Sequence, residues 1–326
     1  MAASFPPVFI VGCQRSGSTM LGAMLGAHPQ IVCLPEAQFI GDFLPADPRD
    51  HVDPGKLLDA IEGHWRFRIW DFDLAGARPE RDEVAPSFAA TICWLARRYA
   101  MFIGKPEARL WVEQQPGHVV RALHLAHHFH DARFLHIVRD GRAVALSLMA
   151  RDWGPQRALA AAKYWQERVA IGLALELELG PIRVRRVLYE ALLDWPRDQL
   201  TSLAAFIGLP YHSAMEQPTG IRLPRFTVED HKLVGSALIP ARASSWRYEM
   251  RGRDVEIIEH QTGDLLPLLG YDLTCGAHPR PVGELEKLRL ALEDHALRMM
   301  RRLRFAWRQH RHLRPPDSLP EGGSEQ

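Results

Sequence analysis

The sequence predicts an α/β fold: a doubly wound parallel sheet flanked by helices, with loop and helix insertions. Three observations support this class. Short apolar runs alternate with segments of helical periodicity along most of the chain. The first run, VFIVG at 8–12, is apolar throughout, as expected for a strand buried on both faces. The glycine-rich stretch GCQRSGST then lies between this strand and a helix, where a phosphate-binding loop belongs.

The remaining elements follow from the same patterns. Asp140 is a favourable N-cap, and Gly208 with Pro210 ends the last helix of the sheet region. Residues 41–85 are rich in Pro, Asp and Gly and contain an aromatic run, so we expect an insertion of loops and short helices there. We expect strands at 8–12, 31–34, 109–113, 133–138 and about 181–189, and helices at 19–28, 87–103, 118–129, 140–151, about 156–179 and 198–209.

Composition restricts the class of protein. The 326 residues include 47% apolar and 24% charged residues and carry a net charge of +1, so no overall field favours nucleic acid as a partner. The four scattered cysteines form no CxxC pair and indicate free thiols, and no signal peptide is visible, so we expect a cytoplasmic protein. We expect one domain over residues 1–280, a basic helix at 281–314 and a disordered tail at 315–326.

The loop GCQRSGST almost matches the Walker A pattern, but Ser18 stands where the lysine belongs and the positive charge is at Arg15. Gly12 and Gly17 allow the tight turn that brings backbone N–H groups onto one anion. Without the lysine, the loop suits a transferred group that carries less charge than a γ-phosphate, such as a sulfuryl group. The alternative is a Gly/Ser-rich turn that binds nothing.

A second basic cluster follows the strand at 133–138. Arg139 ends this strand at the edge of the sheet where ligands bind, and Ser147 and Arg151 are four residues apart on the next helix. Two guanidinium groups and a hydroxyl near a helix N-terminus make a good dianion site. The alternatives are an ion pair between Arg139 and Asp140 and a solvated helix end at Arg151. RFLHIVRD also resembles a Walker B strand, so a P-loop kinase remains an alternative interpretation of the sequence.

Three stretches together resemble the family of sulfotransferases that use 3′-phosphoadenosine-5′-phosphosulfate (PAPS) and have a P-loop-type fold. Within this family, they resemble the branch of the tyrosylprotein sulfotransferases and related bacterial enzymes. They are VGCQRSGSTML, FLHIVRDGRAVALSLMAR and VLYEALLDWPRDQLTSLAAFIGLP, in the family's order. The resemblance implies that Glu36 is the general base and that Arg15 stabilises charge on the transferring group. It also implies a donor site formed by Arg15, Ser16, Gly17, Ser18, Thr19, Arg139, Ser147, Arg151, Tyr189 and Ser236.

Two positions depart from the family pattern. Gln114 stands where the family often has a lysine that stabilises the leaving group, with His118 as a possible substitute. Ser245 stands where a basic residue commonly precedes Trp246, and Arg242 or Arg247 could replace it.

The resulting hypothesis is a PAPS-dependent O-sulfotransferase that releases 3′-phosphoadenosine-5′-phosphate (PAP) and uses no metal. Glycan, metabolite and peptide tyrosine hydroxyls all remain open as acceptors. A P-loop kinase and a nucleotide-binding module without catalysis are the alternatives. From Arg298 to Arg314 the chain has seven arginines and no acidic residue, so this basic helix could contact an anionic membrane or an acidic acceptor. The alternative is a helix that packs on the domain with a basic outer face.

Overall fold

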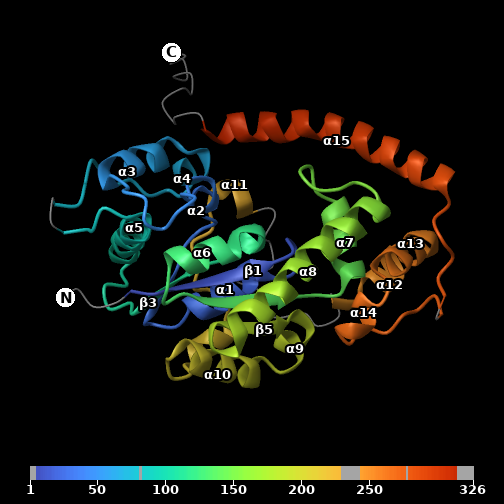
Figure 1. The fold of residues 1–326 in the computed structure, drawn as a ribbon, viewed down its shortest axis with the longest axis horizontal. Helices are drawn as coiled ribbons and strands as arrows, with labels where there is room; N and C mark the ends of the chain where they lie inside the picture. Colours follow the sequence, from blue (N-terminus) through green and yellow to red (C-terminus); the bar gives the residue numbers. More distant parts are fainter. Residues whose placement is uncertain (1–4, 81–82, 229–242, 277, 314–326) are drawn as a thin grey trace, which may run out of the picture.

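The computed structural model describes residues 5–80, 83–228, 243–276 and 278–313. Within these ranges, five parallel strands form one sheet in the order β2-β3-β1-β4-β5, and the predicted α/β class is confirmed (Figure 1). The strands are β1 (Pro7–Gly12), β2 (Ile31–Cys33), β3 (Leu110–Glu113), β4 (Arg133–Val138) and β5 (Val184–Leu188). In this order, β2 and β3 lie on one side of β1, and β4 and β5 lie on the other. The switch point of this topology therefore lies at the end of β1, beside the glycine-rich loop.

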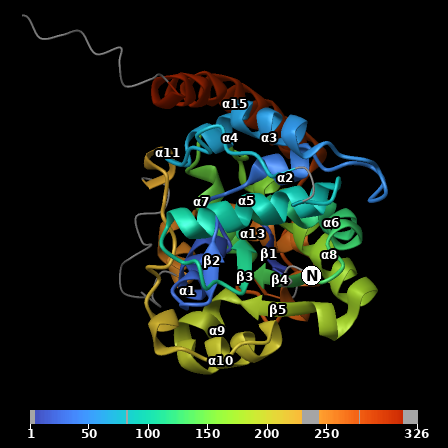
Figure 2. The ribbon, with the colours of Figure 1, turned by 90° about the vertical axis from the view of Figure 1, so that its left-hand side faces the viewer.

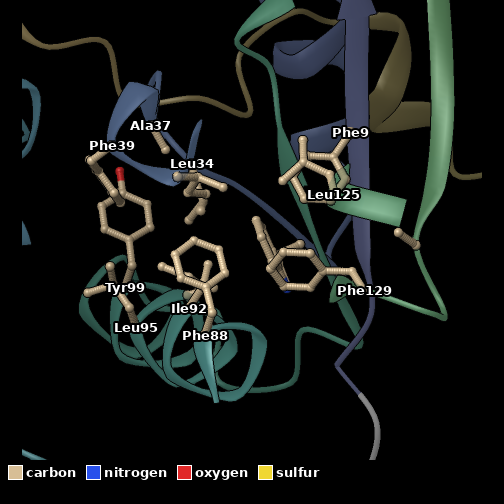
Figure 3. Packing of buried hydrophobic residues seen from close by; sticks show 14 of the residues in the cluster. Phe9, Leu34, Ala37, Phe39, Phe88, Ile92, Leu95, Tyr99, Leu125 and Phe129 are labelled. Atoms are coloured by element: carbon tan, nitrogen blue, oxygen red, sulfur yellow. The ribbon is translucent and has the colours of Figure 1, made fainter. Parts of the chain in front are cut away.

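Different helices cover the two faces of the sheet (Figure 2). On β1, Phe9 and Val11 face the cluster formed with α5 (Phe88–Phe102) and α6 (Ala122–His128), whereas Val8 and Ile10 face the cluster formed with α1 (Ser18–Gly26) and α10 (Pro196–Ile207). This alternation, with both sides apolar, explains why the strand reads as a continuous hydrophobic run. Figure 3 shows the aromatic side of this core, where the rings of Phe9 and Phe129 meet edge to face.

The helices of the sheet region lie close to the predicted ranges, except that the short helix at Tyr189–Asp194 was not predicted. They are α1 (Ser18–Gly26), α5 (Phe88–Phe102), α6 (Ala122–His128), α7 (Gly141–Met149), α8 (Ala158–Arg183), α9 (Tyr189–Asp194) and α10 (Pro196–Ile207). The Asp140 side chain caps α7 by accepting from the Arg142 N–H at 2.8 Å, and Gly208 ends α10 in the left-handed region with φ 81°.

Two expected elements differ from the structure. The α-helix expected at 118–129 begins only at Ala122, as α6. The residues before it form a 3₁₀ turn, η1 (Pro116–Arg121), which has Pro116 at its first position. The strand expected from about 181 begins only at Val184. A kink at Gly180, with φ 69°, redirects the chain within α8. One more helical turn follows the kink before β5 begins.

The insertion between β2 and α5 consists of loops and short helices, as expected. The short helices here are α2 (Gln38–Asp42), α3 (Pro54–Gly63) and α4 (Trp65–Arg68). Beyond α10 the chain forms η2 (Ser213–Glu216), α11 (Arg225–Val228), α12 (Trp246–Glu249), α13 (Gly252–Thr262), α14 (Leu265–Leu268) and α15 (Glu284–Leu313). In the part of the chain that the structure describes, none of the helices combines the length and hydrophobicity needed to cross a bilayer.

Candidate active site

The glycine-rich loop between β1 and α1 depends on its two glycines. Gly12 has φ 147°, and a Cβ atom there would lie 2.4 Å from the carbonyl oxygen of Ile137 on β4. Gly17 has φ 100°, and a Cβ atom there would lie 2.4 Å from the ring of Tyr189. Arg15 also adopts a left-handed conformation, with φ 72°, which is uncommon for a residue with a side chain. The loop is therefore held tightly against β4 and the start of α9.

Polar groups of this loop point to an anion as its ligand. The hydroxyl of Ser16 is fully buried and has no hydrogen-bond partner. Ser18 and Thr19 open α1, and no side chain caps this helix at Gly17. The first N–H groups of a helix have no partner within it and carry its positive partial charge. A buried hydroxyl beside this helix end fits a phosphate or phosphosulfate group.

The structure brings the two predicted donor segments together. The Nε atom of Arg15 donates to the Ser147 hydroxyl at 3.0 Å, which joins the loop to α7. Arg139 donates through Nη1 to the carbonyl oxygen of Arg15 at 3.2 Å. The guanidinium of Arg139 also lies 4.4 Å from the centre of the Tyr189 ring. Four of the predicted site residues therefore form one contiguous group.

The third basic residue of the predicted donor site, Arg151, is positioned differently from the sequence argument. Helix α7 ends at Met149, and the Arg151 N–H donates to the carbonyl of Leu148. Arg151 therefore follows the helix, and the turn, not helical periodicity, sets its distance from Ser147. Its own carbonyl accepts from the Nη1 atom of Arg301 on α15 at 3.0 Å.

Asp140 is committed to a structural role. Its carboxylate binds the Arg142 guanidinium at 2.8 Å, and Arg142 in turn binds Glu259. The predicted alternative of an Arg139–Asp140 ion pair is therefore replaced by an Arg142–Asp140 pair. Because one carboxylate serves both as the helix cap and as the partner of Arg142, this arrangement does not resemble a Walker B magnesium ligand.

Glu36 lines a small pocket. Its carboxylate oxygen Oε2 is 3.1 Å from Nη2 of Arg66, and its carbonyl accepts from the Trp70 indole at 3.2 Å. Gln114 lies in the same pocket, and its buried Oε1 has no hydrogen-bond partner. The complete lining is Pro35, Glu36, Arg66, Ile69, Gln114, Leu223, Pro224 and Thr227. The proposed base and the residue in place of the family lysine thus face one space.

A buried carboxyl, Glu113, supports the segment that carries Glu36. Its oxygens accept from the backbone N–H groups of Ala37 at 3.1 Å and Gln115 at 3.0 Å. Burial raises the pKa of Glu113 to about 8. His118 is also buried, lies 3.5 Å from Glu113 and contacts the Ala37 carbonyl, and burial lowers its pKa to about 4. His118 is therefore buried and is not among the residues that line the pocket.

Some sequence expectations fall elsewhere. Ser236 and Arg242 lie outside the described residues. Ser245 precedes α12, and the Trp246 ring packs 4.0 Å from the Arg142 guanidinium. Of the aromatic run in the insertion, Phe67 and Trp70 are buried in the core, whereas their neighbours Arg66 and Ile69 line the pocket.

Sequence reasoning missed two residues of this region, Arg66 and Glu113. Arg66 lies among the aromatic residues of the insertion, where neither spacing nor a motif distinguishes it. Glu113 carried a usable signal. It ends a fully apolar strand at the carboxyl edge of a parallel sheet, where functional side chains gather.

Comparisons with known proteins identify the family of this chain. Residues 6–213 match the sulfotransferase family. The chain is 26% identical to protein-tyrosine sulfotransferase 2 of Gallus gallus over 295 residues, covering 85% of this chain and 73% of that one. It is 25% identical to protein-tyrosine sulfotransferase of Drosophila melanogaster, covering 82% of this chain but only 52% of that longer protein.

Among solved structures, the sulfotransferase domain of the Synechococcus PCC 7002 olefin synthase has the same fold, with a TM-score of 0.54 at 23% identity. The alignment covers 84% of this chain and 98% of that domain. The family match extends from β1 through α10 and so contains the loop, Glu36 and the Arg139 cluster. This chain belongs to the sulfotransferase family and is an enzyme that transfers sulfate.

Proposed function

We propose that this enzyme transfers the sulfuryl group of PAPS to an acceptor hydroxyl. The observation that carries the proposal is the hydrogen bond from Arg15 to Ser147. It joins a loop suited to a 5′-phosphosulfate to a helix suited to a 3′-phosphate. AMP and ATP have no 3′-phosphate, so a site built from both segments suits PAPS.

The residues present fit this donor. The buried Ser16 hydroxyl and the uncapped start of α1 supply hydrogen-bond donors for the 5′ side. Arg139, Ser147 and Arg151 would hold the 3′-phosphate, and Tyr189 would contact the adenosine. When bound, PAPS supplies the sulfuryl group and leaves as PAP. Arg15 stabilises the negative charge that develops on the oxygens during transfer.

Glu36 accepts the acceptor's proton in this proposal. The acceptor oxygen forms a bond to sulfur, the bond between sulfur and the phosphate oxygen breaks, and the hydroxyl proton passes to the Glu36 carboxylate. Arg66 orients that carboxylate through Oε2 and leaves Oε1 to receive the proton. Gln114 can donate a hydrogen bond where the family lysine would place a charge.

The first acceptor to test is a peptide tyrosine, because relatives similar over most of this chain are protein-tyrosine sulfotransferases. Glycan and metabolite hydroxyls form the other arms of the acceptor screen. We expect transfer of ³⁵S from labelled PAPS to at least one of these acceptor classes. Calorimetry should show that the protein binds PAP at least about tenfold more tightly than AMP. Equal affinity for PAP and AMP would contradict the assignment of the 3′-phosphate site.

A further inference from the structure

Helix α15 exposes its apolar side to solvent. Leu285, Leu303 and Trp307 are 86%, 75% and 64% exposed. At 100° per residue these positions fall on one stripe along the helix. We call this stripe the outer face of α15; it consists of Leu285, Leu288, Leu292, Met299, Met300, Leu303 and Trp307. An amphipathic helix on a globular domain normally turns such a stripe toward the core.

The opposite side of α15 faces the domain (Figure 1) and is held there by packing of Leu290 and Phe305 and by polar contacts. Asp294 accepts from the backbone N–H of Gln156 at 2.6 Å. Arg301 donates to the carbonyl of Met149 at 3.1 Å, and Arg308 pairs with Asp152 at 3.1 Å. The inner side therefore has its own partners, so rotation of the helix to bury the outer face would break these contacts.

Positive charge accompanies the outer face. After Asp294 the helix has no acidic residue, and Arg302 and Arg304 are exposed on its two flanks. Within the described ranges, neither of these arginines forms an ion pair. Beside the helix, a groove of about 360 Å³ against α8 combines an apolar floor, which includes Leu159 and Met299, with the cationic groups of Lys163 and Arg302.

We propose that the outer face of α15 is a docking surface for an anionic lipid bilayer. A helix that lies in the membrane interface needs a leucine- and tryptophan-rich face flanked by arginines. Tryptophan favours the depth of the headgroups, which suits Trp307. Arginines on both flanks would meet phosphate oxygens of the lipids. The net charge of only +1 for the whole chain makes this attraction a local property of α15.

A second copy of the chain fits this surface less well. An antiparallel pair of α15 helices would set the arginines of one copy against the acidic residues in the first half of the other. Two of these acids, Glu286 and Glu293, already pair with Arg253 at 2.5 Å and Arg157 at 2.7 Å. A parallel pair would oppose arginine to arginine. Phospholipid headgroups supply the missing negative charge without disturbing these ion pairs.

The test is flotation of the full chain with vesicles of phosphatidylcholine alone or with about one third phosphatidylserine. We expect binding to the anionic vesicles and at least about tenfold weaker binding to the neutral ones. Leu303→Glu with Trp307→Glu should reduce binding to anionic vesicles at least about tenfold, because both apolar contacts are lost. Arg302→Glu with Arg304→Glu should do the same, since each arginine near an anionic leaflet contributes roughly a fivefold factor.

Leu177→Glu is the matched control. Leu177 is 88% exposed on α8, outside the outer face, and this variant should bind vesicles like the unmodified protein. PAP affinity and melting temperature should stay unchanged in all variants, which separates lipid binding from folding and from the donor site. Equal binding to both vesicle types, or no binding to either, would overturn the proposal. A dimer in sedimentation velocity that Leu303→Glu dissociates would identify a second copy as the occupant instead.

Discussion

Replacement of Glu36 by glutamine separates proton transfer from donor binding. The change keeps the side chain's size, and the amide oxygen can still accept from Arg66, which lies 3.1 Å from Oε2. Stability should therefore fall by only about 1 kcal/mol, the difference between a charge-assisted and a neutral hydrogen bond. The glutamine cannot take the acceptor's proton. Turnover should drop by about 10²–10⁴, which corresponds to about 3–5 kcal/mol in the barrier.

Two measurements decide this prediction. Initial rates of ³⁵S transfer at saturating PAPS give the change in kcat, and calorimetry gives the affinity for PAP, which should change less than about twofold because Glu36 lies on the acceptor side. Glu178→Gln, an exposed change on α8, is the control for the substitution itself. A Glu36→Gln enzyme that folds normally and keeps near-normal kcat would refute the role of Glu36 as base. The proton would then go to another group.

The remaining predictions probe the donor site and the buried carboxyl. Arg15→Ala should lower PAP affinity and kcat together, because the charge acts on the bound donor and in the transition state. Ser147→Ala should weaken PAP binding about five- to tenfold and leave AMP binding unchanged, as expected for one hydrogen bond to the 3′-phosphate. Burial raises the pKa of Glu113 from 4.5 to about 8, so unfolding releases its proton between these values and stability falls as pH rises through them. Glu113→Gln should remove this part of the slope in denaturant titrations at pH 5, 6.5 and 8; an unchanged slope would refute it. Turnover should persist in excess EDTA, and its loss with recovery on added Mg²⁺ would favour kinase-like chemistry.

Most of the fold could be predicted because the four strands β1 to β4 are almost entirely buried. A strand such as β1 must then be apolar throughout, and the glycines at the two ends of the following loop, Gly12 and Gly17, are required by close contacts with Ile137 and Tyr189. The errors occur where a single residue redirects the chain. The kink at Gly180 and the 3₁₀ turn after Pro116 depend on local backbone geometry, which hydrophobic periodicity does not record.

Residue chemistry alone indicated the candidate site only where its residues lie in one motif, and Glu36 was assigned from the family resemblance. The loop and the Arg139 cluster each occupy a short stretch, so their residue types and spacing indicate their chemistry. The Glu36–Arg66 pair joins residues 30 positions apart through an insertion without periodicity. The outer face of α15 was hidden for another reason. Sequence shows that a helix is amphipathic, but only the contacts of Asp294, Arg301 and Arg308 show which side faces the domain.

Arg15 shows what replaces the lysine of an ordinary phosphate loop. Its side chain binds Ser147 and its carbonyl accepts from Arg139, so one residue contacts both parts of the second cluster. A left-handed φ of 72° is needed to direct these two groups, and such a conformation costs a residue with a side chain about 1 kcal/mol or more. The loop tolerates this strain because two hydrogen bonds compensate for it. Charge at Arg15 is therefore tied to the segment that we propose for the 3′-phosphate, whereas a lysine at position 18 would act on the proposed 5′ side alone.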